Sequence, residues 1–99
     1  MILDAGHGQS DPGKIGVNGK EEKDINLSIA KKVERKLKKQ RIVVKMTRTE
    51  DKGLDDTKIG DMKERVKLIN GTKPNLAVSI HQNSYTQEEI KGAQVFYFT

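Results

Sequence analysis

The sequence predicts an α/β fold: a three-layer, open, mostly parallel sheet with helices on both faces. Two observations carry this prediction. Short apolar runs of strand length alternate with longer amphipathic segments, and their order along the chain is β-α-β-α-β-β. Strands and helices that alternate in this way are joined by right-handed parallel crossovers, and 99 residues leave room for a single domain. If the first strand lies between the second and the third, a ligand crevice falls between the first and third strands at their carboxyl ends.

The first half of the chain supplies a strand, a loop and a helix. Residues 1–4 form a short, largely apolar run, and residues 5–20 contain five glycines, which predicts a loop. From residue 21 to residue 40 apolar side chains recur at four-residue steps, which predicts a helix with one buried face. This predicted face consists of Ile25, Ile29, Val33 and Leu37, with Ala30 alongside. Acidic residues in the first turn and lysines in the last suit the helix dipole.

The second half supplies strands around one more helix. A β-branched run at residues 42–47 predicts the second strand, and the polar loop after it ends near Asp61, which predicts this residue as a helix N-cap. The predicted buried stripe of the second helix is Met62, Val66 and Ile69. Residues 76–80 are nearly all apolar, which is typical of a central parallel strand. A last strand is predicted at residues 93–98.

Charge and composition limit the classes of function. Lysine and arginine number 19 against 14 aspartates and glutamates, a net charge of +5. The lysine-rich end of the first helix could suit nucleic acid, but no aromatic residues are interleaved there for base stacking, so a solvated helix face is favoured and no nucleic-acid partner is expected. Cysteine is absent, so a metal would need histidine, aspartate or glutamate. Neither a transmembrane segment nor an export signal is expected within this chain.

Both histidines of the chain stand just beyond predicted strand ends. His7 lies between two glycines after the first strand, and His81 directly follows the third. One histidine in a glycine-rich loop is more often a surface residue than a ligand, but two at matching strand ends favour a shared site. An acidic pair, Glu21 and Glu22, opens the first helix. A His, Glu, His set of this kind could hold zinc and leave one position open for water.

These residues belong to a longer set of motifs by which the chain resembles the zinc-dependent N-acetylmuramoyl-L-alanine amidases of the Amidase_3 type, which are cell-wall hydrolases. The motifs occur in the order and spacing of that family and run through essentially the whole chain. They are Ile2-Leu3-Asp4-Ala5-Gly6-His7-Gly8, Asp11-Pro12-Gly13, Glu22-Lys23-Asp24-Ile25-Asn26-Leu27, Thr47-Arg48 with Asp51, Arg65 with Asn70, and Ser79-Ile80-His81-Gln82-Asn83-Ser84 followed by Gly92-Ala93. The motif that opens the first helix looks most like the sporulation- and germination-associated branch, whose members act on cortex peptidoglycan.

The resemblance implies a site and a reaction. His7, Glu22 and His81 would be the zinc ligands, with Glu21 as the rival for the carboxylate, and the Glu-Lys pairing of the family favours Glu22. The ion would polarise the substrate carbonyl and activate its bound water; no catalytic residue beyond this water is identifiable in the chain. The bond cut would join N-acetylmuramic acid to L-alanine in peptidoglycan. The parent protein would therefore act outside the cytoplasm, in the cell wall or the spore cortex.

Two departures from the family pattern bear on these expectations. Gln9 stands where the family usually has a second glycine after His-Gly, and we expect this change to alter the loop but not metal binding. The family domain continues with further strands and helices and a late glutamate, the general acid/base, so residues 1–99 are expected to be the N-terminal part of a catalytic domain. Without that glutamate, the chain could instead be a zinc-holding fragment or a non-catalytic wall-binding module. The sheet edge at residues 93–98 would favour a homo-oligomer.

Overall fold

The computed structural model describes residues 1–84, 86 and 89–97. Its sheet has three parallel strands in the order β2-β1-β3, with β1 at Ile2–Ala5, β2 at Lys45–Met46 and β3 at Ala77–Ile80. Because β1 pairs with β2 on one side and with β3 on the other, it is the central strand. The predicted parallel pairing is confirmed, and of the orders left open by the sequence the structure has the one with the first strand between the second and the third.

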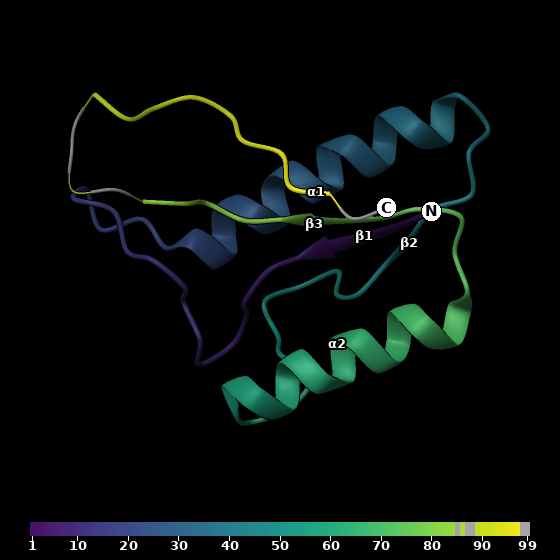
Figure 1. Ribbon diagram of the computed structural model, residues 1–99, viewed down its shortest axis with the longest axis horizontal. Coiled ribbons are helices and arrows are strands. Elements are labelled where there is room, and N and C mark those ends of the chain that lie inside the picture. The colour runs from purple at the N-terminus through teal and green to yellow at the C-terminus, as the bar shows by residue number, and fades with distance from the viewer. Residues whose placement is uncertain (85, 87–88, 98–99) are drawn as a thin grey trace.

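Two helices flank this sheet. α1 spans Glu22–Lys39 and leads from β1 to β2, and α2 spans Lys58–Thr72 and leads from β2 to β3. Figure 1 shows the two helices on opposite sides of the strands, so the predicted α/β class with helices on both faces is confirmed. In the described part of the chain, neither helix combines the length and the apolar character needed to cross a bilayer.

The core lies between β1 and α1. All four residues of β1 are buried, and Leu3 and Ala5 pack with Ala30 of α1 and Met46 of β2. Partly buried apolar side chains widen this cluster: Met1, Leu27, Val33, Leu37, Val44 and Ile80. The best-packed strand is therefore the one that leads directly to His7, which gives that residue a rigid base.

The buried face of α1 is rotated from the predicted one. The helix agrees with the predicted residues 21–40 to within one residue at each end, and Val33 and Leu37 pack against the core as expected. Ile29, however, is 37% exposed. The buried residues of the helix are Glu22, Lys23, Asn26 and Ala30. Polar side chains take the inward positions in the first turns because this end of α1 faces the polar loop that follows β1, not the apolar core.

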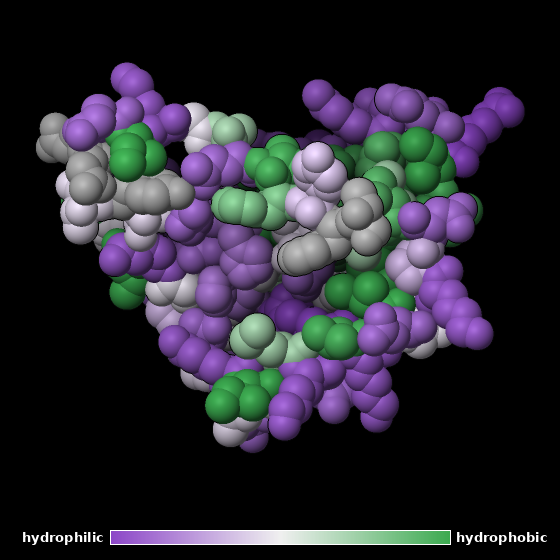
Figure 2. Space-filling model, viewed as in Figure 1, coloured by the Kyte–Doolittle hydropathy of each residue, from purple (hydrophilic) through white to green (hydrophobic). Residues whose placement is uncertain are grey.

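The predicted buried stripe of α2 is wrong. Met62 and Val66 are 66% and 56% exposed, Ile69 is only partly buried, and the buried residue of this helix is Arg65. In Figure 2 hydrophobic side chains lie open over α2. The stripe stays exposed because the helix reaches the sheet through the long polar side chain of Arg65.

The predicted N-cap of α2 is also wrong. Thr57 holds that position, and its hydroxyl accepts a hydrogen bond from the Gly60 amide at 3.0 Å. Asp61 lies in the first turn of the helix, where its carboxylate pairs with Arg65 Nε at 2.6 Å. Both threonine and aspartate cap helices well, so residue type alone does not predict which of the two is the N-cap. Here the carboxylate of Asp61 pairs with Arg65, and Thr57 caps the helix.

The outer strands are shorter or more exposed than predicted. β2 covers two of the six residues predicted at 42–47. β3 lies at the edge of the sheet formed by the described residues, with Val78 37% exposed, because β1 is its one partner there. Residues 93–97 form no strand, and residue 98 lies outside the described residues. Val95, Phe96 and Tyr97 are 85%, 78% and 80% exposed. A strand needs a paired neighbour, and the described part of the chain supplies none to this segment.

Candidate metal centre

The end of β1 turns sharply to present His7. His7 has a φ of 63°, in the left-handed region that L-residues rarely adopt. Gly6 lies against the imidazole of His81, and a Cβ atom at Gly6 would collide with that ring. A glycine before His7 is therefore required for the two histidines to approach, as the glycine-flanked loop predicted.

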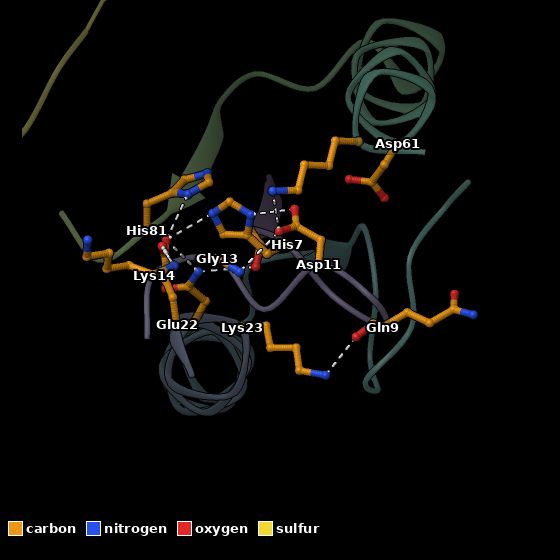
Figure 3. Close-up of polar contacts among 12 residues, drawn as sticks. His7, Gln9, Asp11, Gly13, Lys14, Glu22, Lys23, Asp61 and His81 are labelled. Carbon is orange, nitrogen blue, oxygen red and sulfur yellow. Dashed lines mark hydrogen bonds and ion pairs between the residues drawn. The ribbon is translucent and has the colours of Figure 1, made fainter. Parts of the chain in front are cut away.

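Two imidazoles converge on one carboxylate. His7 Nε2 lies 3.2 Å from Glu22 Oε2, and His81 Nδ1 lies 3.1 Å from the same oxygen. Each of the three residues offers one ligand atom, and these atoms lie within 4.8 Å of one another. Figure 3 shows the His7 ring between Asp11 and Glu22, with His81 on the Glu22 side. Glu21 is not part of the group, since its carboxylate lies 3.5 Å from Lys23 Nζ.

The Glu22 carboxylate is fixed by donors on both oxygens. The Lys14 amide donates to Oε1 at 3.0 Å, the Gln82 amide donates to Oε2 at 2.9 Å, and Asn26 Nδ2 donates to Oε2 at 3.2 Å. Burial opposes ionisation of Glu22, but these hydrogen bonds and the charge of His7 together lower the pKa of its carboxyl below the ordinary value. The group is therefore an anion held in one orientation.

The loop that follows His7 folds back onto the start of α1. The amide of Glu22 donates to the Lys14 carbonyl at 2.9 Å, and the amide of Lys23 donates to the Pro12 carbonyl at 3.0 Å. These bonds satisfy the first amides of a helix whose N-cap side chain makes no capping bond. Gly13 sits between the two parts with a φ of 70°, and a Cβ atom there would lie 2.6 Å from His7 Cδ2. The loop and the helix start thus place Glu22 beside His7.

Asp11 faces the other side of the His7 ring. Its Oδ2 lies 2.7 Å from His7 Nδ1, and its Oδ1 accepts the Gly13 amide at 3.1 Å. Burial opposes ionisation, but the hydrogen bonds with His7 and Gly13 and the charges of His7 and Lys58 lower the pKa of the Asp11 carboxyl. His7 therefore lies between two carboxylates.

Two buried arginines hold the backbone that carries His7. Arg48 donates from Nε to the Ala5 carbonyl at 2.9 Å and from Nη2 to the Gly6 carbonyl at 3.0 Å. Arg65 donates from Nη1 to Ala5 at 2.7 Å and from Nη2 to the His7 carbonyl at 2.6 Å. Three successive carbonyls thus accept hydrogen bonds from guanidinium groups. Because each guanidinium is planar and donates several hydrogen bonds at once, it holds these carbonyls in fixed positions.

Sequence reasoning identified Asp11, Asn26, Arg48 and Arg65 as motif members but gave them no role. The signal available for Asn26 was its spacing of four residues from Glu22, which places both side chains on one face of α1. The same spacing of Asp11 from His7 gave no such signal, because both residues lie in a loop and not on a helix. Arg65 had a local signal in its spacing of four residues from Asp61, but the other partners of the two arginines are distant in sequence: Arg65 and Asp4 are 61 residues apart.

The donor set fits zinc. Neutral imidazole nitrogen and carboxylate oxygen are common zinc ligands, and three protein ligands are the usual number at sites that keep a position open. One oxygen of Glu22 lies close to a nitrogen of each ring. A shared cation would attract all three atoms, whereas without a cation an imidazole nitrogen and a carboxylate oxygen approach each other only with a proton between them. Among the described residues these three form the one group with such convergence.

Comparison with known proteins agrees with the family resemblance of the sequence motifs. The family model described as N-acetylmuramoyl-L-alanine amidase matches residues 1–99. The germination-specific N-acetylmuramoyl-L-alanine amidase of Bacillus subtilis is 41% identical over 107 residues, which cover 99% of this chain and 44% of that protein. The amidase AmiA of Escherichia coli is 35% identical over 96 residues, which cover 97% of this chain and 31% of that protein. The chain thus spans less than half the length of these relatives.

Solved structures agree with the sequence comparison. The CwlD amidase from Clostridioides difficile, solved in complex with the GerS lipoprotein, has a TM-score of 0.81 and 33% identity, over 90% of this chain and 50% of that one. The catalytic domain of CwlV, an N-acetylmuramoyl-L-alanine amidase from Bacillus (Paenibacillus) polymyxa var. colistinus, has a TM-score of 0.75 and 40% identity, over 87% of this chain and 46% of that one. This chain therefore belongs to the N-acetylmuramoyl-L-alanine amidase family.

Proposed function

We propose that this chain holds a zinc ion through His7, Glu22 and His81 and serves the hydrolysis of the amide bond between N-acetylmuramic acid and L-alanine in peptidoglycan. The observation that carries the proposal is the approach of both imidazoles to Glu22 Oε2. The three residues come from three separate segments of the chain. Two nitrogen donors among three ligands favour zinc over magnesium or calcium, which prefer oxygen.

When bound at such a site, zinc polarises a carbonyl and lowers the pKa of its water ligand. The residues of this chain have the task of holding three donors in a fixed arrangement. Glu22 supplies the negative charge and is kept in place by the amides of Lys14 and Gln82. His81 is half exposed, so its side of the group is the open one from which a substrate can approach. The chain thus provides metal binding and substrate access at the carboxyl ends of β1 and β3.

We also infer that residues 1–99 are the N-terminal part of a longer catalytic domain, with a role in remodelling spore-cortex peptidoglycan outside the cytoplasm. The share of each relative that the chain covers supports the first inference. The 41% identity with the germination-specific amidase of Bacillus subtilis supports the second. A peptidoglycan substrate in turn requires action on the outer side of the membrane.

Zinc content and amide hydrolysis test the proposal together. The purified chain should bind about one zinc ion, measured by elemental analysis after removal of excess metal, and His81→Ala should lose most of it because one of three ligands is gone. With a muramoyl-L-alanyl peptide as substrate, and with residues 1–99 within the longer catalytic domain inferred above, newly released L-alanine amino groups should appear with the wild type and not with His81→Ala.

Lys36→Ala is the matched control, since Lys36 is an exposed residue of α1 far along the helix from Glu22. It should retain both zinc and hydrolysis. Equal zinc content in wild type and His81→Ala would contradict the metal site. Full zinc content without any hydrolysis would leave the metal site in place and contradict the catalytic assignment for this chain.

A further inference from the structure

The two ring nitrogens of His7 face two different carboxylates. Nδ1 lies 2.7 Å from Asp11 Oδ2, and Nε2 lies 3.2 Å from Glu22 Oε2. Figure 3 shows the ring held between them. Only a ring nitrogen without a proton can bind a metal ion, so the carboxylate that accepts a hydrogen bond from the protonated nitrogen decides which nitrogen is available.

The geometry separates the roles of the two carboxylates. Glu22 Oε2 is shared with His81 Nδ1 and with the Gln82 amide, so it lies at the point where the donors converge. Asp11 lies outside this convergence, on the far side of the His7 ring. The shorter contact, on the Asp11 side, is the hydrogen bond, and the longer one faces the proposed ion.

Asp11 is itself held in place by the loop. Its amide and carbonyl pair with those of Gly8 at 3.0 and 2.9 Å, so the loop closes between these two residues. Its Oδ1 accepts the Gly13 amide at 3.1 Å, which fixes the rotation of the carboxylate. Lys58 Nζ approaches the same oxygen at 3.5 Å from the first residue of α2. Oδ2 is thereby aimed at the His7 ring.

We infer that Asp11 is a positioning residue of the metal centre: its carboxylate accepts a hydrogen bond from the Nδ1–H group of His7 and so leaves Nε2 unprotonated for the zinc ion. The inference rests on the proposed zinc binding. Histidine ligands are commonly oriented in this way by a carboxylate, which fixes the tautomer and makes the ligating nitrogen more basic. Removal of such a partner typically weakens metal affinity by about 10–100-fold.

Zinc affinity of three proteins, measured by competition with a chromophoric chelator, tests the inference. Asp11→Asn keeps the size of the side chain but removes its charge, and it should bind zinc about 10–100-fold more weakly than the wild type. Asp56→Asn makes the same change at an exposed aspartate of the loop before α2 and should bind as the wild type does. Equal affinities for wild type and Asp11→Asn would overturn the inference and leave the zinc site intact. A wild type that binds no zinc would overturn the proposed function and, with it, the inference.

Nitrogen NMR of the His7 ring in the wild type provides a readout that does not depend on how a variant folds. In the zinc-loaded chain, Nε2 should show the shift of a metal-bound nitrogen and Nδ1 should carry the proton. In Asp11→Asn, provided its amide spectrum remains that of a folded chain, the Nδ1 proton should exchange faster with water. Zinc bound through Nδ1 in the wild type, or a metal-free ring that carries its proton on Nε2 alone, would overturn the inference.

Discussion

At the scale of single residues, a buried carboxylate connects the elements around β1. Asp4 Oδ1 accepts from Thr47 Oγ1 at 2.8 Å and from Arg65 Nη1 at 2.7 Å, and Oδ2 accepts from Ser79 Oγ at 2.7 Å. These donors come from the end of β2, from α2 and from β3. A buried ion pair contributes little net stability compared with an apolar core, but breaking it leaves a buried charge without a partner. Asp4 therefore fixes the relative position of three elements.

The first prediction at this scale concerns Asp4→Asn. The variant should unfold with a free energy lower by about 2–3 kcal/mol near neutral pH, because the Arg65 guanidinium loses a charged partner. Asp56→Asn, an exposed aspartate, should change this free energy by less than about 0.5 kcal/mol. Denaturant titration measures both. A loss at Asp4 no larger than at Asp56 would show that the pair contributes nothing.

The difference in unfolding free energy between the wild type and Asp4→Asn should depend on pH. Burial raises the pKa of Asp4, but hydrogen bonds from Ser79, Arg65 and Thr47 outweigh this effect and lower it. Because the native carboxyl binds its proton less tightly than the unfolded one, the stabilisation is complete above the unfolded pKa of about 3.9 and is lost as pH falls through the native value. The difference between wild type and Asp4→Asn should therefore narrow below about pH 4. A constant difference down to about pH 2 would contradict it.

At the scale of elements, α2 docks through one arginine. Arg65 is the buried residue of the helix, and its guanidinium reaches Asp4, the Ala5 carbonyl and the His7 carbonyl. Asp61, one turn earlier, holds the same guanidinium from the helix side at 2.6 Å. The attachment of α2 to the sheet is therefore polar and specific, whereas α1 adds apolar packing along its length to the polar contacts of its first turns.

Arg65→Leu tests this view of α2. The variant should lower the free energy of unfolding by about 3–5 kcal/mol, since it leaves the buried carboxylate of Asp4 and the partly buried one of Asp61 without their cation. Val66→Ala alters the neighbouring position on the exposed stripe and should cost about 0.5 kcal/mol or less. Thermal or denaturant unfolding of both variants provides the comparison. If Val66→Ala cost as much as Arg65→Leu, the apolar stripe would be the true docking face.

Sequence periodicity was enough to predict how many helices the described chain has and where they lie, but it left the order of the strands open. It failed on which faces are buried. A four-residue apolar repeat shows that a helix can bury a stripe, but burial also needs a neighbouring element to cover it. On α1, the loop after β1 bonds to Glu22 and Lys23, which are buried, while Ile29 stays exposed. On α2, the buried residue is Arg65, and Met62 and Val66 stay exposed.

The candidate site was predictable in part for a related reason. His7, Glu22 and His81 follow strand ends or open a helix, and the topology brings such positions together. The residues that hold them could not be ranked from sequence, because their partners lie far along the chain: Arg48 and the Gly6 carbonyl are 42 residues apart. In the structure the three side chains lie together, and their role as ligands stays a proposal.

At the scale of the whole molecule, apolar side chains remain on the surface in two places. Ile59, Met62 and Val66 of α2 are 69%, 66% and 56% exposed. Val95, Phe96 and Tyr97, in the segment predicted as a last strand, are 78% exposed or more. The outer edge of β3 adds unpaired backbone groups within the described sheet. Apolar groups and open strand edges of this kind favour association.

We therefore predict that the chain self-associates, although the expected strand at residues 93–98 is not formed over residues 93–97. The contact should bury more than about 800 Å² in total, the usual upper size of an adventitious contact. Sedimentation equilibrium should show an average mass that rises with concentration. Phe96→Ser should lower it toward the monomer by removing an aromatic ring from the exposed segment, and Lys36→Ala should leave it unchanged. The net charge of +5 opposes association, so added salt should strengthen it in the wild type. A monomer at every concentration and salt level would show that these apolar side chains do not bind a second copy.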